Sequence, residues 1–242
     1  MTIIYRIYQL LFALPVGLLA TLLTAIVTIV GCAVGGQRFW GYYPGRCWSW
    51  LLVRLFLLPV TVEGRERITP GQSYIFCPNH QGSFDIFLVY GFLGRNFKWV
   101  LKQSLINIPF VGKACQSAGF IFIDNHNPKK IQKSIEKARR SLTDGMSVVV
   151  FPEGRRTFTG AMGDYKRGAF LLADELQLPV VPITINGSFQ VKPRTNDLGF
   201  VVWHPLRLTI HEPLQPIGKG AENMQYLAEK SREATLSALE EV

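Results

Sequence analysis

A histidine and an aspartate five residues apart, His80 and Asp85, are the side chains in this sequence best suited to acid–base chemistry. A carboxylate that bonds one imidazole nitrogen fixes the tautomer and leaves the other nitrogen able to accept a proton. The spacing therefore predicts a His/Asp dyad acting as a general base. The alternative is a chance pairing, because an aspartate in the first turn of a helix is common for dipole reasons alone.

The strand expected before His80 explains how the imidazole is presented. Residues 73–77, Ser-Tyr-Ile-Phe-Cys, have the β-branched and aromatic content of a buried strand. Pro78 cannot donate to a sheet ladder, so the strand should end there, with Asn79 and His80 just beyond it. We therefore expect the histidine at a strand end, where side chains of neighbouring elements converge.

A helix that begins a few residues later should carry the carboxylate. Ser83 has the short hydroxyl side chain of an N-cap residue, and residues 84–92 contain apolar side chains that would line one side of a helix. Asp85 then falls in the first turn of that helix. A strand end that faces a helix start brings His80 and Asp85 to one concave spot, as a dyad requires.

A second motif repeats this pattern further along the chain. Residues 148–157, Val-Val-Val-Phe-Pro-Glu-Gly-Arg-Arg-Thr, are an apolar strand, a proline stop and polar residues around Gly154. Glycine lets the backbone turn tightly, so Arg155 and Arg156 can reach the same end of the sheet as His80. Because guanidinium groups bind phosphate in a bidentate manner, we expect a phosphate site here.

The N-terminal region is apolar and basic. The chain of 242 residues has a net charge of +9, yet its first 62 residues contain no Asp or Glu. Residues 7–37 carry no formal charge, and their core, residues 10–34, would be about 37 Å long as a helix, enough to cross a bilayer. The segment is too long for a signal peptide and lacks a small-residue cleavage pattern, so we expect a retained anchor.

Two arrangements of this anchor are open. If it spans the bilayer, the positive charges of Arg38, Arg46 and Arg54 predict a cytoplasmic domain and an external N-terminus. Pro15 and Gly17 would instead allow a re-entrant hairpin in one leaflet, with both ends cytoplasmic. A buried core helix of a soluble protein is the remaining alternative, and the length of the segment disfavours it.

An aromatic and basic stretch follows the anchor. Residues 46–58 combine tryptophans with arginines, a composition that favours the bilayer interface. Trp40, Tyr42 and Tyr43 extend this aromatic belt upstream. The same stretch also fits a helix packed on the domain, so the sequence predicts a helix here and leaves its environment open.

The rest of the chain alternates between strand and helix patterns. This alternation predicts an α/β fold with a mostly parallel central sheet flanked by helices. We divide the chain into a membrane anchor with an interfacial helix, residues 1–58, and a domain, residues 59–242. The expected strands are residues 60–62, 73–77, 97–101, 120–123, 147–151, 179–185, 201–203 and 207–211, and the expected helices are 84–92, 110–118, 128–144, 168–176 and 221–239.

The charge and the cysteines limit the partners. A basic chain fits nucleic acid or an anionic lipid surface, but here the cations are interleaved with an apolar anchor and no nucleic-acid motif occurs. We therefore expect membrane lipids as partners and no nucleic acid. The four cysteines have no paired spacing, so we expect small buried thiols, no disulfide framework and no metal site.

Taken together, the motifs resemble the four sequence blocks of the glycerolipid acyltransferases. Each block alone is weak evidence, whereas all of them in order and at the family's spacing are specific. The similarity runs from about residue 60 to residue 190, and within the family the chain is most similar to bacterial 1-acylglycerol-3-phosphate acyltransferases. The matching segments are His80-x4-Asp85, residues 119–124, Phe151-Pro152-Glu153-Gly154-x-Arg156, Lys166-x-Gly168-Ala169-Phe170 and Val181-Pro182-Ile183.

The resemblance implies an acyl transfer without a cofactor. The donor would be an acyl thioester of coenzyme A or acyl carrier protein, and the acceptor a lysophospholipid at the bacterial inner membrane, with the domain facing the cytoplasm. It further implies that His80 is the general base, that Asp85 orients it, and that Arg156 holds the phosphate with help from Arg155 and Lys102. Motif residues expected to support this site are Asn79, Ser83, Glu153, Gly154, Lys166 and Pro182.

Two positions depart from the family pattern. The second block usually ends in an arginine, where this chain has Asn125, and the third usually has a threonine, where this chain has Arg155. The gained arginine would compensate for the lost one, or the acceptor headgroup would differ and lack phosphate, as in an amino-acid lysolipid. A third possibility is that Arg155 is a solvent-exposed loop residue with no role in binding. For the protein as a whole, the rival function outside enzymology is a membrane tether without catalytic activity.

Overall fold

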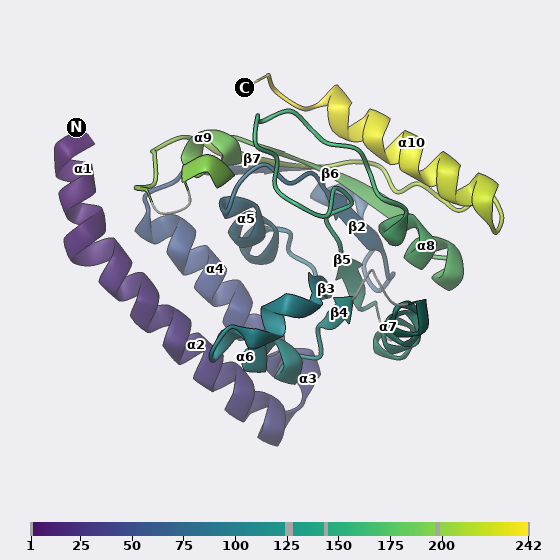
Figure 1. The fold of residues 1–242 in the computed structure, drawn as a ribbon, viewed down its shortest axis with the longest axis horizontal. Helices are drawn as coiled ribbons and strands as arrows, with labels where there is room; N and C mark the ends of the chain where they lie inside the picture. Colours follow the sequence, from purple (N-terminus) through teal and green to yellow (C-terminus); the bar gives the residue numbers. More distant parts are fainter. Residues whose placement is uncertain (1, 124–127, 143–144, 197–198, 242) are drawn as a thin grey trace.

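The computed structural model describes residues 2–123, 128–142, 145–196 and 199–241 (Figure 1). A long N-terminal helical segment precedes an α/β domain. The strands are β1 (Val60–Glu63), β2 (Ile75–Pro78), β3 (Phe97–Lys102), β4 (Ile121–Ile123), β5 (Ser147–Val149), β6 (Val180–Asn186) and β7 (Leu206–Ile210). The α-helices are α1 (Thr2–Tyr8), α2 (Leu14–Gly35), α3 (Gln37–Trp40), α4 (Tyr43–Leu55), α5 (Phe84–Phe92), α6 (Val111–Ser117), α7 (Pro128–Ser141), α8 (Arg167–Leu176), α9 (Ser188–Val191) and α10 (Ala221–Ser237).

The seven strands form one sheet in the order β1-β7-β6-β2-β5-β3-β4. All neighbouring strands are parallel except β6 and β7, so β1 and β7 run opposite to the other five. This confirms the predicted mostly parallel sheet flanked by helices. The strand predicted at residues 201–203 was wrong, because these residues form an irregular segment before β7.

Helices cover both faces of the sheet, and strand β2 shows why. Side chains alternate between faces along a strand, so Tyr74 and Phe76 join the core under α4 and α5, whereas Ile75 and Cys77 join the core under α7, α8 and α10. Figure 1 shows these two helical layers on opposite sides of the strands. A strand that is apolar on both sides is typical of a buried central position in a parallel sheet.

The N-terminal segment is one continuous helix with a π-helical turn, η1 (Gln9–Ala13), between α1 and α2. It is long and apolar enough to cross a membrane by length and composition, and most of its large apolar side chains are exposed. Of the two arrangements left open by the sequence, a hairpin at Pro15 and Gly17 does not occur, because the helix continues through both residues. The chain reverses instead at Gly36, whose φ of 88° lies in the left-handed region.

Polar side chains dock this helix on the domain. The hydroxyl groups of Tyr5 and Tyr8 donate to the carbonyls of Phe56 and Leu55. Further along, the Trp48 indole donates to the Thr21 hydroxyl at 2.9 Å. The helix therefore contacts α4 near both its start and its middle, and Figure 1 shows it running alongside α4 and α6.

Helix α4 is packed between the N-terminal helix and α5, which answers the question left open by the sequence. Ser49, Leu52 and Val53 are buried, whereas Trp50 on the same helix is half exposed. Tyr42 was wrongly predicted to lie in an aromatic belt, because it is buried against Tyr90 and Phe97. The prediction of buried cysteines also fails at Cys47, which is exposed.

A close contact between two glycines and a tryptophan fixes the turn after α2. A Cβ added at Gly31 would lie 2.4 Å from the Trp40 ring, and one added at Gly35 would lie 2.2 Å from it. The indole thus lies directly on the glycine face of the helix. The Gly-x-x-x-Gly pattern, which often joins helices of separate chains in membranes, is occupied here by a side chain of the same molecule.

We predict that Gly31→Ala destabilises the fold by about 1–3 kcal/mol, because the added methyl group must displace the Trp40 ring. Thermal unfolding of the detergent-solubilised protein measures the effect. Gly168→Ala is the matched control, since a Cβ there meets no atom within 4 Å. Equal stability of the two variants would contradict the observed packing.

Candidate active site

The candidate residues meet at the carboxyl edge of the sheet. His80 follows β2, the Glu153–Arg156 segment follows β5, and the two strands are adjacent and parallel. Their connections therefore emerge side by side, as at ligand sites of open α/β sheets. A backbone hydrogen bond from Thr157 N–H to the His80 carbonyl, at 3.0 Å, ties the two segments together.

His80 and Asp85 form the predicted pair. The Nδ1 atom of His80 lies 2.7 Å from Oδ2 of Asp85, and the Asp85 side chain is fully buried. The same carboxylate oxygen accepts the backbone N–H groups of Gln81 and Gly82, at 2.7 and 2.9 Å. An acceptor held in this way assigns the proton to Nδ1, and within the described part of the chain Nε2 has no hydrogen-bond partner.

Two further residues fix the histidine from other sides. The Phe151 ring stacks on the imidazole with centroids 3.9 Å apart and planes 14° apart. Glu153 accepts the backbone N–H of His80 through Oε1 at 2.7 Å. The ring is therefore held along one edge and one face, which leaves the edge bearing Nε2 directed away from these contacts.

Glu153 also joins the loop that follows it. Its second oxygen, Oε2, accepts the N–H of Gly163 at 2.7 Å, while Gln81 donates to the carbonyl of Gly160 at 3.0 Å. Burial raises the pKa of the Glu153 carboxyl to about 7, against the two N–H donors from His80 and Gly163, which lower it. Glu153 thus couples the histidine segment to residues 160–163.

Asn79 holds the end of β2 against β6. The side chain is fully buried, and its amide donates to the carbonyl of Ile185 and accepts the N–H of the same residue, at 3.0 and 2.7 Å. This pair continues the ladder past Pro78, which pairs with Ile183. Pro182, beside Cys77 on β6, accepts the N–H of His211 through its carbonyl at 3.0 Å. Both residues thus support the strand ends that carry the site.

Ser83 lies at the start of α5, but its predicted capping role was wrong. Its side chain makes no cap hydrogen bond, and its hydroxyl instead accepts a hydrogen bond from the Arg156 guanidinium at 2.5 Å. Arg156 is half-buried, so this contact directs its side chain toward the start of α5. The two motifs are therefore joined through their side chains as well as their backbones.

The other predicted cations lie around this contact with fewer restraints. Arg155 and Lys166 are exposed, and the Lys166 side chain lies within 3.2–3.5 Å of the position of a Cβ on Gly154. Gly154 has a φ of 71°, so its backbone needs glycine and the lysine lies across it. Lys102 is exposed at the end of β3, and within the described residues no contact joins it to Arg156. Asn125 lies outside the described residues.

Sequence reasoning missed several contributors. Phe151 was named as part of a family motif and as the end of a strand, but its stacking on His80 was not predicted, although an aromatic residue before a proline stop was a usable signal. Arg194 has its guanidinium 4.1 Å from the centre of the Phe158 ring and donates to the Arg156 carbonyl at 3.4 Å. No local pattern predicts that contact, because the segments that carry the two arginines lie in different parts of the chain.

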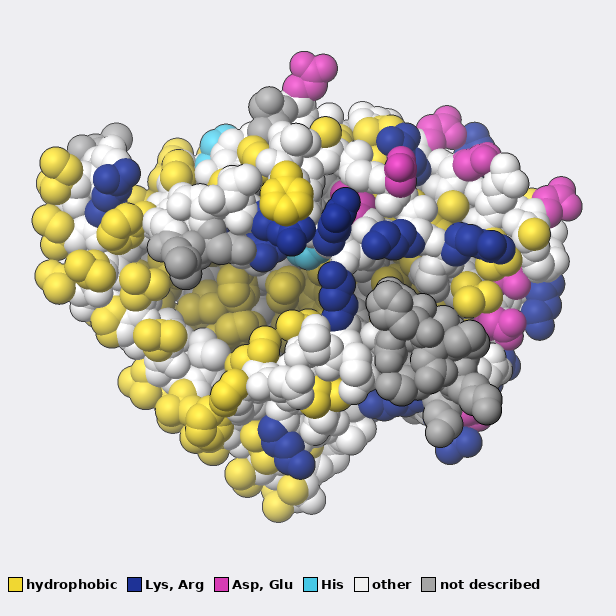
Figure 2. All heavy atoms as spheres, in the orientation of Figure 1, with side chains coloured by type: hydrophobic (Ala, Val, Ile, Leu, Met, Phe, Trp, Pro, Cys, Tyr) yellow, Lys and Arg dark blue, Asp and Glu magenta, His cyan; other side chains and the backbone are white. Residues whose placement is uncertain are grey.

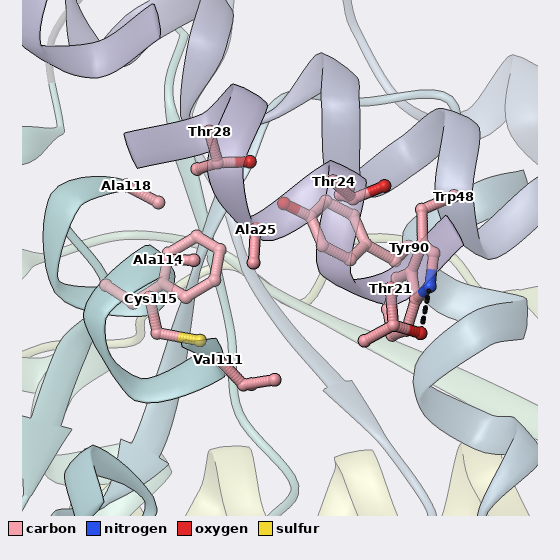
Figure 3. Close-up of a pocket in the computed structure, with 12 residues that line it drawn as sticks. Thr21, Thr24, Ala25, Thr28, Trp48, Tyr90, Val111, Ala114, Cys115 and Ala118 are labelled. Carbon is pink, nitrogen blue, oxygen red and sulfur yellow. Dashed lines mark hydrogen bonds between the residues drawn. The ribbon is translucent and has the colours of Figure 1, made fainter. Parts of the chain in front are cut away.

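The surface around the site is hollowed. Figure 2 shows a hollow with a largely apolar floor, Lys and Arg side chains along its rim, and a histidine at its edge. A separate cavity of about 80 Å³ lies between α2, α4 and α6 (Figure 3). Its lining includes Thr21, Trp48 and Tyr90 but neither His80 nor Asp85, and it is smaller than the roughly 300–1,000 Å³ of usual ligand sites. The apolar hollow is thus the better candidate for substrate entry.

A histidine held by a buried carboxylate, with an arginine contributed by the neighbouring segment, suits acyl transfer to an acceptor that bears phosphate, and comparison with known proteins agrees. The sequence profile of the Acyltransferase family matches residues 59–186. A human 1-acyl-sn-glycerol-3-phosphate acyltransferase alpha is 31% identical over 91% of this chain and 78% of its own length. The chain therefore belongs to the acyltransferase family that contains these enzymes.

Two further comparisons cover different shares of the matched proteins. A chloroplast 1-acyl-sn-glycerol-3-phosphate acyltransferase of Arabidopsis thaliana is 28% identical over 86% of this chain, and the match spans 59% of that protein. The crystal structure of a 1-acyl-sn-glycerophosphate acyltransferase from Thermotoga maritima superposes with a TM-score of 0.68 at 24% identity. That match covers 96% of this chain and all of the other, so the two share a fold over their whole length.

The raised pKa of Glu153 makes a testable contribution to stability. Its value of about 7 in the folded protein exceeds the ordinary 4.5, so the folded state binds the proton more tightly than the unfolded state. The free energy of unfolding should therefore fall as the pH rises through the window from about 4.5 to about 7.

Glu153→Gln should flatten this dependence, because the amide does not titrate. Thermal unfolding at several pH values across the window measures it, with Glu136→Gln on the exposed face of α7 as the control. Parallel curves for wild type and Glu153→Gln would show that the carboxyl ionises in the folded protein as it does in the unfolded chain.

Proposed function

We propose that this chain transfers a fatty acyl group from an acyl thioester to the free hydroxyl of 1-acylglycerol-3-phosphate, which forms phosphatidic acid. The observation that carries the proposal is the 2.7 Å contact between His80 Nδ1 and the buried Asp85 carboxylate, which leaves Nε2 available as a base. The names of the human and chloroplast relatives support the choice of acceptor.

In the proposed reaction His80 Nε2 takes the proton of the acceptor hydroxyl as its oxygen attacks the thioester carbonyl carbon. Asp85 keeps the proton on Nδ1 and stabilises the imidazolium that forms. The C–S bond then breaks, and the departing thiol receives the proton from Nε2. Acyl oxygen ester and thiol are the products, and no atom of the protein is acylated.

Ser83 is the obvious candidate for a covalent intermediate, but its surroundings argue against that role. Its hydroxyl accepts a hydrogen bond from the Arg156 guanidinium at 2.5 Å, and a guanidinium, which stays protonated, cannot take the proton of the serine. A nucleophilic serine needs a partner that accepts its proton. We therefore assign Ser83 to positioning Arg156.

The proposed phosphate site is centred on Arg156. The Arg156 side chain contacts Ser83, and the backbone of the next residue, Thr157, bonds the His80 carbonyl. Arg156 would therefore hold the phosphate close enough to His80 for the free hydroxyl of the acceptor to reach Nε2. Arg155 and Lys102, both exposed, would add long-range attraction rather than fixed contacts. The donor is a thioester of coenzyme A or of acyl carrier protein.

The membrane contact follows from the N-terminal helix. Because α1 and α2 are docked along the domain, a helix perpendicular to the bilayer would carry the domain into the hydrocarbon with it. We therefore infer that the helix lies in one leaflet, with its exposed apolar side in lipid and its docked side on the domain. Positive charges at Arg38, Arg46 and Arg54 favour the cytoplasmic leaflet of a bacterial inner membrane.

We predict that His80→Ala lowers the acyl-transfer rate by about 10²–10⁴-fold, because the proton acceptor is lost while the core is untouched. Assays with 1-acylglycerol-3-phosphate and an acyl thioester measure it, and circular dichroism checks folding. Ser83→Ala is the matched comparison and should retain far more activity than His80→Ala. A well-folded His80→Ala enzyme within a few fold of wild type would refute the proposed base.

We predict that Arg156→Ala raises the KM for the acceptor by about ten- to a hundredfold, with a smaller effect on the donor KM, as expected for one lost charge-assisted contact to phosphate. Arg140→Ala, on the exposed side of α7, is the control for loss of charge. Arg155→Thr should have a smaller effect than Arg156→Ala. If Arg155→Thr were instead the more harmful change, Arg155 would be the main phosphate ligand.

A further inference from the structure

Large apolar side chains are exposed at two places beside the candidate site. One, which we call the β7 lip, consists of Leu57 and the segment before β7, with exposed Phe200, Val202 and Trp203. The other, the β3 lip, follows β3 and exposes Leu105, Ile108 and Phe110. Scattered single apolar residues are normal on a protein surface, whereas two groups of this kind require an explanation.

The sheet topology sets both lips on the same edge as the dyad. The β3 lip follows the carboxyl end of β3, which runs parallel to β5 and β2. Because β1 and β7 run the opposite way, the residues that precede them emerge at that edge too. In the strand order β2 lies between β7 and β3, so the lips flank His80 on its two sides.

The β7 lip is held rigidly. Gln9 donates to the Val201 carbonyl at 2.8 Å and accepts the Val201 N–H at 2.9 Å, which buries Val201 against the N-terminal helix. The Trp203 indole donates to the Leu57 carbonyl at 2.9 Å. The neighbouring apolar side chains are therefore turned outward by fixed contacts rather than by disorder of a loop.

The backbone at two lip residues is strained. Among the described non-glycine residues only Leu57, Phe110 and Gln177 have positive φ, with values of 57°, 59° and 52°. Positive φ is disfavoured for side chains larger than those of Gly, Asn or Asp, and Phe110, whose ψ is −51°, lies outside the left-handed helical region as well. Leu57 and Phe110 are also 56% and 59% exposed, so packing against the described residues does not explain why large apolar residues occupy these positions.

The lips continue the apolar surface of the N-terminal helix. The Arg6 guanidinium lies 5.6 Å from the centre of the Phe200 ring, and α2 packs on α6 just beyond the β3 lip. Figure 1 shows the segment before β7 near α1 and the segment before α6 near α2. Neither lip contains an acidic residue, and aromatic side chains beside arginine are typical of the bilayer interface.

We propose that both lips insert into the interface of the leaflet that holds the N-terminal helix, so that the edge of the sheet carrying the dyad opens directly onto lipid. The occupant is a bilayer with anionic headgroups. A lysophospholipid would then move from the leaflet to His80 without crossing water. The identity of this acceptor rests on the proposed function, whereas the contact between the lips and the bilayer does not.

The first test replaces the strained apolar residues by a polar residue that tolerates their backbone. Leu57→Asn combined with Phe110→Asn should fold as well as wild type, because both side chains are more than half exposed and asparagine tolerates a positive φ better than leucine or phenylalanine does. With lysophosphatidate embedded in phosphatidylcholine and phosphatidylglycerol vesicles, kcat/KM should fall by about tenfold, from the loss of two interfacial apolar side chains. With a short-chain acceptor dispersed in water, the rate should stay within about twofold of wild type.

The control is Ile217→Asn. Ile217 is 55% exposed, which matches Leu57, but it lies near Leu214, which pairs with Val180 at the opposite, amino edge of the sheet. This variant should behave as wild type on both acceptors. Equal loss in the control and the lip variant, or no loss in either, would overturn the proposal.

The second test does not depend on catalysis. The tryptophan fluorescence of full-length wild type and Trp203→Phe is compared in vesicles with lipids brominated on the acyl chains. The signal contributed by Trp203 should be quenched by the brominated lipid and shielded from aqueous acrylamide. Quenching by acrylamide instead would place the lip in water, and shielding from both quenchers in a particle of twice the mass would assign the lip to a second copy of the chain. Either result would reject the lipid contact, even if the enzyme acted as proposed.

Discussion

The buried carboxylate of Asp85 is the interaction on which the arrangement of the site depends. A carboxylate removed from water requires several donors, and here one oxygen takes three, from the His80 imidazole and the N–H groups of Gln81 and Gly82. The three donors force the chain between β2 and α5 to wrap around the first turn of the helix. The imidazole is consequently presented with one nitrogen bound and the other directed outward.

The remaining contacts carry this arrangement outward to the rest of the molecule. Glu153 and Phe151 fix the histidine from the β5 segment, and Ser83 passes the connection on to Arg156. On the other side, Asn79 fastens the end of β2 to β6. The N-terminal helix in turn binds the segment before β7 through Gln9, so this apolar helix and the edge of the sheet that carries His80 are connected by direct contacts.

The sequence was sufficient for those features that depend on local pattern. The alternation of strands and helices, the proline stop after β2 and the spacing of His80 and Asp85 all predicted what the structure contains. Contacts between side chains that lie far apart in the sequence were not predictable in this way. Ser83 had the features of a cap, but a guanidinium from 73 residues away engages its hydroxyl instead.

The other failures have the same physical origin. Residues 201–203 resemble a strand, yet the Gln9 amide takes both main-chain groups of Val201 that a ladder would need. Pro15 does not reverse the chain, because the π-helical turn just before it lets the helix continue without the missing donor. In both cases the structure depends on a feature that hydrophobic periodicity does not encode, namely a distant hydrogen-bond partner or a π-helical turn.

The central claim is that the Asp85 carboxylate holds the proton on Nδ1 of His80 and leaves Nε2 as the base. Nitrogen NMR of the detergent-solubilised protein with ¹⁵N-labelled histidine, assigned by comparison with His80→Gln, reads the tautomer directly. The account predicts a protonated Nδ1 coupled to its own hydrogen and an unprotonated Nε2 in the neutral imidazole, with this preference lost in Asp85→Asn. A proton on Nε2 in the wild-type protein, or equal populations of the two tautomers, would contradict it.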